Sequence, residues 1–255
     1  MDAEKVTVQQ LAEALDRWAP WAGAESWDNV GVLAGADAPF SAVLCALDIT
    51  PAVVCEAVRR GCGAVVSHHP VIFSPLKALM PGTAPYLLAQ HGVAAVCAHT
   101  NLDKAAGGVG DALAASLGLS SIEPCGEYCR RGALPCQMTA RELAAHVQAA
   151  LGAPVRFADA GAPVRTVGVI SGAGNELWAE AKAAGCDAFV TGEMGHHDAL
   201  DALEAGLTCV VSTHHATERV IVPVLAQHLR AAFPGLSVLE SETDTEPFRA
   251  LQAGA

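Results

Sequence analysis

Histidines and acidic residues gather where several predicted strands end. Residues 68–69 follow the apolar run Ala-Val-Val-Ser, 99–103 follow Val-Cys-Ala, and 213–218 follow Cys-Val-Val-Ser, while Asp48 and Glu193 end two further strands. In open α/β sheets, ligands bind just beyond the carboxyl ends of the strands. A mixed set of imidazoles and carboxylates suits zinc, iron, manganese or cobalt better than calcium or a thiolate-bound metal. The pattern therefore predicts a metal site, and its candidate ligands are His68, His69, Asp103, His214 and Glu218.

The adjacent pair His68-His69 has two interpretations. Neighbouring residues on a strand point to opposite faces, and Pro70 favours an extended backbone at His69. The two imidazoles are then expected to serve different ions, or one of them to support the other's ligands. The alternative is one buried, hydrogen-bonded histidine beside a solvated one.

The remaining candidate ligands also have structural alternatives. His214 and Glu218 are four residues apart, which places them on one helix face, as metal ligands or as an exposed pair. A Glu218 carboxylate that bridged two ions would offset their mutual repulsion. Asp103 is a ligand or a turn residue that caps the next helix. His99 is a ligand or a group that orients Asp103, and we favour the second role.

Three further features bear on chemistry. The polar segment 192–198 contains Glu193 and His197, which suit substrate contact or proton transfer, although glycine and aspartate are also ordinary at a helix start. The glycine-rich turn 171–174 lacks a full phosphate-binding pattern, so a plain tight turn is favoured. The cysteines Cys125, Cys129 and Cys136 lack a paired CxxC spacing, which argues against structural zinc.

Short apolar runs alternate with helical segments, and this pattern predicts an α/β fold that positions these groups. The segment 120–135 is rich in glycine, proline, cysteine and charge and is interpreted as a linker or crossover. Pro223 is expected to kink the last helix or to mark a restart. The predicted strands span 43–47, 63–67, 93–98, 166–170, 188–191, 207–212 and 237–240, and the predicted helices span 50–60, 86–91, 111–117, 139–151, 176–184, 197–205 and 216–232.

Composition limits the class of protein. The 255 residues are 52% hydrophobic and 16% charged, which is typical of a compact globular chain. A net charge of -12 opposes nonspecific binding to nucleic acid and to anionic membranes. We find no apolar run of membrane-spanning length and no signal-like N-terminal segment. Nine cysteines, mostly inside apolar runs, are typical of free thiols in the reducing cytoplasm.

Together these motifs resemble the NIF3-like dinuclear metal-centre family, which includes proteins labelled GTP cyclohydrolase 1 type 2. The resemblance spans nearly the whole chain and implies the short form, with two α/β domains whose mixed sheets are flanked by helices. It implies a metal-binding domain of 1–124 plus 209–255, interrupted by a smaller domain of 125–208. The carriers are Ser26-Trp27-Asp28-Asn29-Val30-Gly31 with Leu33 and Gly35, Ser67-His68-His69-Pro70, His99 to Asp103 with Gly107-Gly108, Gly192-Glu193 with His196-His197-Asp198, and His214-x-x-x-Glu218.

The resemblance also implies a function. Two divalent ions per chain (zinc, iron, manganese or cobalt) are expected, with Glu218 as the bridge, in a homohexameric ring. The first hypothesis is a hydrolase that opens a purine ring or cyclic amide, with His99, Glu193 or His197 moving protons. Its substrate would be a small molecule such as a nucleotide.

The alternative is a metal-binding ring that acts as a scaffold or regulator. Handling of DNA inside the ring is disfavoured by the acidic balance. Three departures from the family pattern occur: Cys129 in place of glycine, His215 in place of tyrosine, and a varied glycine turn at 171–174.

Overall fold

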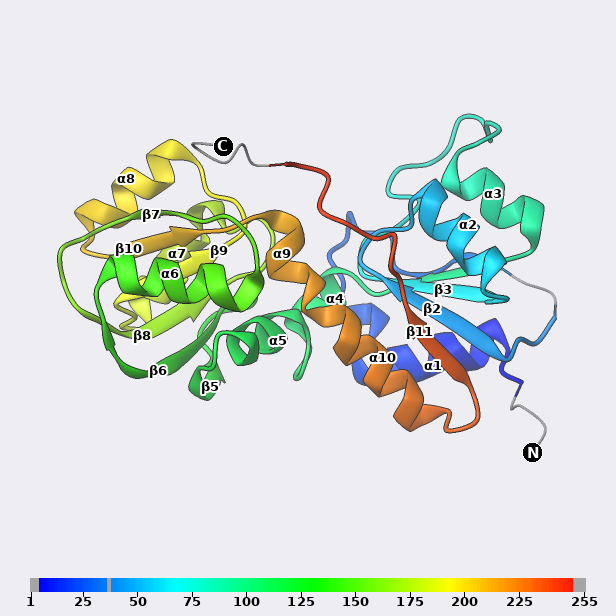
Figure 1. Ribbon diagram of the computed structural model, residues 1–255, viewed down its shortest axis with the longest axis horizontal. Coiled ribbons are helices and arrows are strands. Elements are labelled where there is room, and N and C mark those ends of the chain that lie inside the picture. Colours follow the sequence, from blue (N-terminus) through cyan, green and yellow to red (C-terminus); the bar gives the residue numbers. More distant parts are fainter. Residues whose placement is uncertain (1–4, 36–37, 250–255) are drawn as a thin grey trace. The chain divides into compact units, whose positions relative to one another are not determined.

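The computed structural model describes residues 5–35 and 38–249 and divides the chain into two compact units (Figure 1). Unit 1 comprises residues 1–108 and 221–245, and unit 2 comprises 109–220 together with the segment from Glu246. The sequence placed the boundaries after residues 124 and 208. They lie after 108 and 220 instead, because residues 120–124 and 208–211 are strands of the unit 2 sheet.

Unit 1 is built on a five-stranded mixed sheet with the order β1-β4-β3-β2-β11. The four neighbouring strands from β4 to β11 are parallel, and β1 pairs antiparallel with β4 at one edge. The central strands are buried on both faces, as parallel strands between helical layers must be. The strands are β1 (Gly31–Ala34), β2 (Ala42–Ala46), β3 (Ala64–Ser67), β4 (Ala94–Cys97) and β11 (Ser237–Glu240).

Helices cover both faces of this sheet. In Figure 1, α2 and α3 lie on one face, and α1 and α10 lie on the other. α2 begins as expected, because Thr50 accepts a hydrogen bond from the Val53 N–H and Pro51 occupies the first helical position. The helices of unit 1 are α1 (Val8–Trp18), η1 (Trp21–Gly23), α2 (Pro51–Arg59), α3 (Ala84–His91), α4 (Thr100–Lys104) and α10 (Ile221–Ala232).

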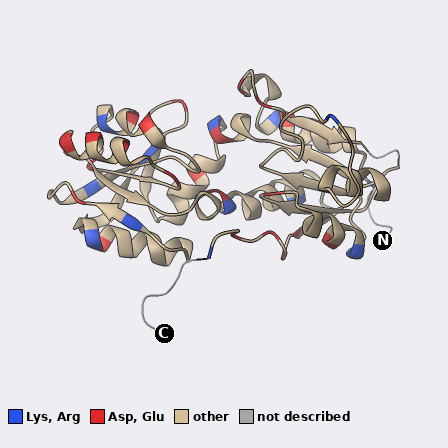
Figure 2. Ribbon diagram, turned by 90° about the horizontal axis from the view of Figure 1, so that it is seen from above, with Lys and Arg blue, Asp and Glu red and all other residues tan. Residues whose placement is uncertain are grey.

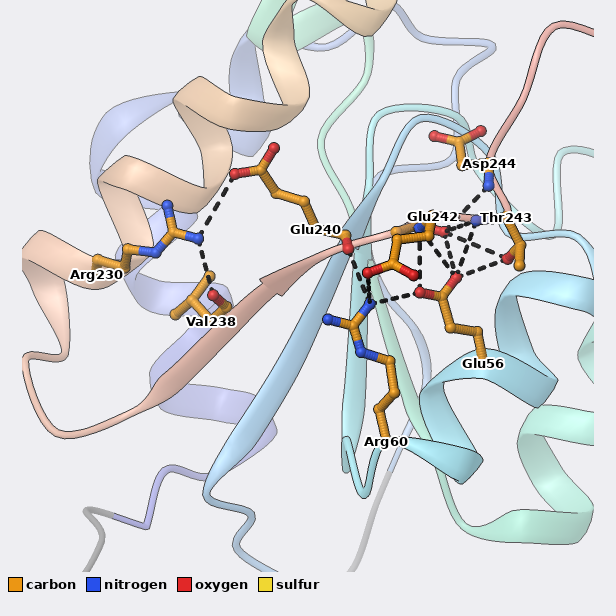
Figure 3. A network of polar contacts seen from close by, with 9 residues as sticks. Glu56, Arg60, Arg230, Val238, Glu240, Glu242, Thr243 and Asp244 are labelled. Atoms are coloured by element: carbon orange, nitrogen blue, oxygen red, sulfur yellow. Dashed lines mark hydrogen bonds and ion pairs between the residues drawn. The ribbon is translucent and has the colours of Figure 1, made fainter.

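A buried carboxylate ties the end of β11 to α2 (Figure 3). Glu56 is fully buried and accepts hydrogen bonds from the Ser241 hydroxyl and from both the hydroxyl and the backbone N–H of Thr243. Arg60 pairs with the same carboxylate at 2.6 Å and also donates to the Glu240 carbonyl. Burial alone would raise the pKa of Glu56, but these donors outweigh it and lower the pKa to about 2.

Unit 2 contains a six-stranded mixed sheet with the order β5-β6-β8-β9-β10-β7. Its centre is parallel (β8, β9 and β10), and its two edges are antiparallel. The strands are β5 (Ser120–Pro124), β6 (Arg130–Met138), β7 (Arg156–Ala158), β8 (Val164–Val169), β9 (Ala188–Thr191) and β10 (Thr208–Val211).

The two faces of this sheet carry separate apolar clusters. One packs residues of α5 and α6 against Val167, Val190 and Val210, and the other packs residues of α7 and α8 against Phe189 and Cys209. Alternate residues of β10 thus serve opposite faces, as strand geometry requires. The helices of unit 2 are α5 (Val109–Ser116), α6 (Ala140–Leu151), η2 (Asn175–Leu177), α7 (Trp178–Ala183), α8 (His196–Glu204) and α9 (His214–Arg219).

The structure tests two predictions made from the sequence, one for the segment 120–135 and one for Pro223. The segment 120–135 is not a linker: it contains β5 and most of β6, which form an antiparallel hairpin. The prediction was wrong because β5 is an edge strand with little burial on either face, so its sequence lacks apolar alternation. Pro223 does mark a restart, since α9 ends at Arg219 and Pro223 lies in the first turn of α10.

Across residues 5–35 and 38–249, we find no helix with both the length and the apolar character needed to cross a lipid bilayer. Acidic and basic residues are interspersed along the ribbon of each unit (Figure 2). The net charge of -12 is thus spread over the chain.

Candidate metal centre

Strand register brings the histidines of unit 1 to one edge of its sheet. β3 and β4 are parallel, with Ser67 opposite Cys97, so the residues that follow each strand leave at the same edge. His68 and His69 follow β3, and His99 follows β4 by two residues. The three imidazole rings have centroid separations of 5.1, 5.1 and 5.5 Å. One ring nitrogen from each lies within 4.8 Å of the others, so this group can hold a metal ion.

Each of these rings is oriented through its Nδ1 atom. Nδ1–H of His68 donates to the Ala98 carbonyl, and Nδ1–H of His69 and of His99 each donates to a carboxylate. The donor–acceptor distance is 2.9 Å in all three hydrogen bonds. Because carbonyl and carboxylate oxygens only accept, Nδ1 carries the proton and Nε2 is the basic nitrogen. An imidazole held in this way is the usual form of a histidine that ligates a metal through Nε2.

The carboxylates that orient His69 and His99 are Asp48 and Asp28. Asp28 is the better held, because its other oxygen accepts from the Thr100 backbone N–H and hydroxyl. Burial acts to raise the pKa of Asp28, but the hydrogen bonds from Thr100 and His99 outweigh it and lower the pKa. Asp28 therefore stays ionised and fixes the ring of His99.

The predicted separation of His68 and His69 onto opposite faces was wrong. β3 ends at Ser67, so both histidines lie past the strand, where side chains no longer alternate. His99 joins the two rings, whereas the sequence favoured it as an orienting group for Asp103. Asp103 lies on α4, and its Oδ1 is 3.5 Å from Nε2 of His68.

Unit 2 carries a second group at the corresponding edge of its own sheet. β9 and β10 are parallel, with Thr191 opposite Val211, so Glu193 and His214 leave at the same edge. Nε2 of His214 is 3.0 Å from Oε2 of Glu218, which confirms that the two side chains share one face of α9. Nδ1 of His214 is 3.3 Å from Oε1 of Glu193.

Two glycines allow the backbone to approach this group. A Cβ on Gly172, whose φ is +60°, would lie 2.2 Å from Oε1 of Glu218, and a Cβ on Gly192 would lie 2.8 Å from the His214 Cα. The Gly172 N–H donates to the Thr217 hydroxyl, so this amide supports α9. The plain-turn interpretation of residues 171–174 therefore fits the structure better than a phosphate loop.

His197 lies on α8, where its exposed ring meets that of His196 at a centroid distance of 5.4 Å. A pocket of about 230 Å³ opens beside the start of this helix. Its walls include Met194 and Val211, and Arg156 and His196 supply its polar groups. Met194 directly follows Glu193, so the pocket adjoins the acidic end of the His214 group.

Sequence reasoning missed the roles of Asp28, Thr100 and Gly172. Asp28 lies 71 residues before His99, and no spacing rule links positions so far apart. Asp48 was noted as an acid at a strand end, but its partner was not predicted. The register of β2 with β3, in which Ala46 is opposite Ser67, is what places Asp48 beside His69.

Comparison with known proteins places the sequence in a family. The family model Duf34/NIF3 (NGG1p interacting factor 3) matches residues 6–247. A "GTP cyclohydrolase 1 type 2 homolog" from Streptomyces coelicolor is 36% identical over 231 residues, covering 83% of this chain and 81% of that protein. The "NGG1-interacting factor 3" of Saccharomyces cerevisiae is 30% identical over 95% of this chain and 96% of its own.

Solved structures share the fold. The crystal structure of a hypothetical protein from Staphylococcus aureus superimposes with a TM-score of 0.91 at 30% identity, over 97% of this chain and 100% of that one. A Bacillus cereus protein related to NIF3 gives a TM-score of 0.91 at 23% identity, over 98% of this chain and 100% of that one. The molecule is thus an α/β protein built from two mixed sheets flanked by helices. The chain belongs to the Duf34/NIF3 family.

Proposed function

We propose that this protein is a hydrolase that uses two divalent metal ions to open a cyclic C–N bond in a small molecule. The observation that carries the proposal is the histidine group of unit 1, in which three imidazoles converge and each is oriented through Nδ1. The proposed ligands are those that the family resemblance implies: His68, His69, Asp103, His214 and Glu218. Zinc, iron, manganese and cobalt all suit this donor set.

Bound divalent ions would supply Lewis acidity, which lowers the pKa of water and stabilises negative charge in the transition state. The chain's own residues set the geometry. Asp28 and Asp48 hold two rings in one tautomer, so that Nε2 is the ligand atom. One ring nitrogen of His99 lies within 4.8 Å of ring nitrogens of His68 and His69, so His99 can add a ligand to this group or move protons beside it.

Proton transfer is assigned to Glu193, with His197 and His99 as further candidates. Glu193 is 56% exposed and lies against His214, so a substrate can reach it. A general acid or base must come within hydrogen-bond distance of the reacting atom, and an exposed carboxylate 3.3 Å from a proposed ligand is available for that role.

Two features support a planar heterocyclic substrate such as a nucleotide. Trp27 and Phe73 are 58% and 53% exposed and lie 5.9 Å apart, and Trp27 also meets the ring of His99 at 6.4 Å. Exposed aromatic faces beside a reactive site suit stacking on a flat ring. The name of the Streptomyces coelicolor relative, a GTP cyclohydrolase homolog, also points to a purine nucleotide.

A second candidate function is a non-catalytic ring that binds metal and acts as a scaffold or regulator. The loop between β3 and α3 favours self-association, because Phe73, Leu76, Leu79 and Met80 are each at least 50% exposed. The proposed assembly is a homohexameric ring. Nucleic acid is a poor partner for a chain of net charge -12. The proposed compartment is the cytoplasm, in keeping with nine cysteines that are all free thiols.

The test compares metal content with turnover. Metal analysis of the purified protein should find two equivalents per chain, and the loaded protein should hydrolyse GTP. His69→Ala and Glu218→Gln should reduce metal content and lower turnover by at least about 100-fold. The matched control is His91→Ala, at the exposed end of α3.

The outcomes separate the two functions. Full metal loading without hydrolysis of GTP, other nucleotides or cyclic amides would reject the hydrolase and favour the scaffold. A folded protein that takes up no divalent ion would reject both. Native mass spectrometry of the same samples tests the hexamer.

A further inference from the structure

Three cysteines that have no part in the proposed metal centre lie together in unit 2. Cys125 and Cys129 flank the turn between β5 and β6, and the Cys125 thiol donates to the Cys129 sulfur over 2.8 Å. Cys125 also accepts a hydrogen bond from the thiol of Cys186, which follows α7. The sequence had grouped the first two with Cys136, but Cys136 is exposed further along β6, so Cys186 takes its place.

This group does not suit a metal ion. Over the described ranges, the sets of side chains whose ligand atoms converge on one point contain histidine and glutamate but no cysteine. The Cys125 sulfur contacts the sulfurs of both Cys129 and Cys186. Two thiols can therefore form a disulfide while the third remains reduced. The relevant chemistry is therefore that of thiols reacting with one another.

The backbone around Cys125 and Cys129 suits a disulfide. Pro124, at the end of β5, pairs with Arg130, at the start of β6. Cys125 and Cys129 face each other one residue closer to the turn, and the Cys125 N–H donates to the Cys129 carbonyl at 2.9 Å. Residues that face each other in this way have Cα atoms about 5.5 Å apart. Disulfides span Cα separations of roughly 4.4–6.8 Å, so the hairpin need not move for the bond to form.

We propose that Cys125 and Cys129 form a redox-active dithiol that an organic hydroperoxide or hydrogen peroxide converts into an intramolecular disulfide. The Cys125 thiolate attacks the terminal peroxide oxygen, and the alcohol (or water) leaves as the sulfur becomes a sulfenic acid. The Cys129 sulfur then attacks the Cys125 sulfur, and water leaves. In total, two thiols and one hydroperoxide give one disulfide, one alcohol and one water, so two electrons pass from sulfur to oxygen.

Accessibility assigns these roles. Cys125 is half-buried and is reached first by an oxidant, whereas Cys129 is fully buried and acts as the resolving thiol. The hydrogen bond to Cys129 is the main cause that raises the pKa of Cys125, to about 12. Only a small fraction is thiolate at neutral pH, so the reaction is slow there and its rate rises about tenfold per pH unit below that pKa.

The experiment uses the full chain, reduced and freed of metals by a chelator so that peroxide does not generate radicals. The protein is treated with tert-butyl hydroperoxide at pH 7 and pH 8, alkylated and digested with trypsin. Cleavage after Lys104 and Arg130 yields one peptide, residues 105–130, whose two cysteines are Cys125 and Cys129. Their disulfide appears as a peptide lighter by two hydrogens that resists alkylation until it is reduced.

The controls separate the pair from general oxidation. Cys186→Ser should still form the disulfide, whereas Cys129→Ser should instead trap Cys125 as a sulfenic acid that reacts with dimedone. The exposed single thiols Cys55 and Cys136 report the background. The proposal is overturned if 105–130 remains fully alkylatable after Cys55 and Cys136 are oxidised. It is equally overturned if Cys125 pairs with Cys186, or if the rate does not rise with pH.

Discussion

Unit 1 contains two clusters of polar groups that are satisfied in opposite ways. Around Glu56, one carboxylate faces a guanidinium, two hydroxyls and backbone N–H groups, so donors surround the acceptor. In the histidine group, each Nδ1–H donates to an oxygen, and the three rings bring nitrogen atoms within 4.8 Å of one another, with the Asp103 carboxylate 3.5 Å from Nε2 of His68. The first cluster is chemically complete, whereas the second is rich in acceptors.

This difference separates structure from function. A carboxylate surrounded by donors, one of them cationic, needs no further ligand and contributes to folding. A cluster of electron-pair donors gains little from its own members and much from a divalent cation. The contrast predicts that changes near Glu56 alter stability without altering metal content, and that changes around the histidines do the reverse.

The largest expected effect on stability comes from Glu56→Gln. The amide retains one acceptor but turns an NH₂ group toward N–H and O–H donors, and Arg60 loses its buried counter-charge. We expect a loss of about 3 kcal/mol in the free energy of unfolding of unit 1. Tryptophan fluorescence in urea measures it, because Trp18, Trp21 and Trp27 belong to unit 1. Reduced metal content in the folded variant would contradict the contrast.

Acid should weaken the same cluster by a nearly equal amount. The pKa of Glu56 in the folded protein is about 2, below its ordinary value of 4.5, so its contribution is complete above pH 4.5 and is lost as the pH falls toward 2. The loss should be on the order of 2–3 kcal/mol. Chelator-treated protein is used, so that release of metal in acid does not add to the effect. Glu56→Gln should flatten this part of the curve, and an unchanged acid limb would rule out Glu56 as its source.

The histidine side of this contrast was accessible from sequence, but the Glu56 cluster was not. Strands such as 43–47 and 93–98 were predicted because apolar runs alternate with helical segments, and the ligand candidates were predicted because they follow such strands. The partners were not predictable: Asp28 meets His99 across 71 residues, and Glu56 meets Thr243 across 187. Pairs so distant are set by sheet order and register, which local patterns do not encode.

The β5–β6 hairpin of unit 2 was not predicted from the sequence, for a related reason. β5 is exposed along most of its length, so it shows no two-residue periodicity, and the Gly, Pro and Cys content of 120–135 suggested a linker. Its strand state comes from pairing with β6, a tertiary contact. The sequence therefore located the chemistry at strand ends but assigned Cys125 and Cys129 to the wrong kind of segment.

A smaller effect, on metal binding alone, is expected from Asp28→Asn. The neutral amide orients His99 less strongly, and its NH₂ group disturbs the bonds from Thr100. Affinity for Zn²⁺ should fall about 10- to 100-fold, measured by competition with a chromogenic chelator. Asp48→Asn is the matched comparison and should cost less, because Asp48 is 44% exposed. Unchanged zinc affinity in both variants would mean that the histidines do not ligate the metal.

The smallest effect is expected at the outer end of the Glu56 cluster, visible in Figure 3, where Glu240 and Arg230 form an ion pair. Their side chains are 36% and 49% exposed and 3.6 Å apart, so water already screens both charges. Glu240→Gln keeps the backbone carbonyl that accepts from Arg60, and it should change stability by about 0.5 kcal/mol or less in the same urea titration. If it instead cost as much as Glu56→Gln, the charge of the cluster and not its burial would hold β11 to α2. The distinction drawn between a closed, donor-rich cluster and an open, acceptor-rich one would then lose its physical basis.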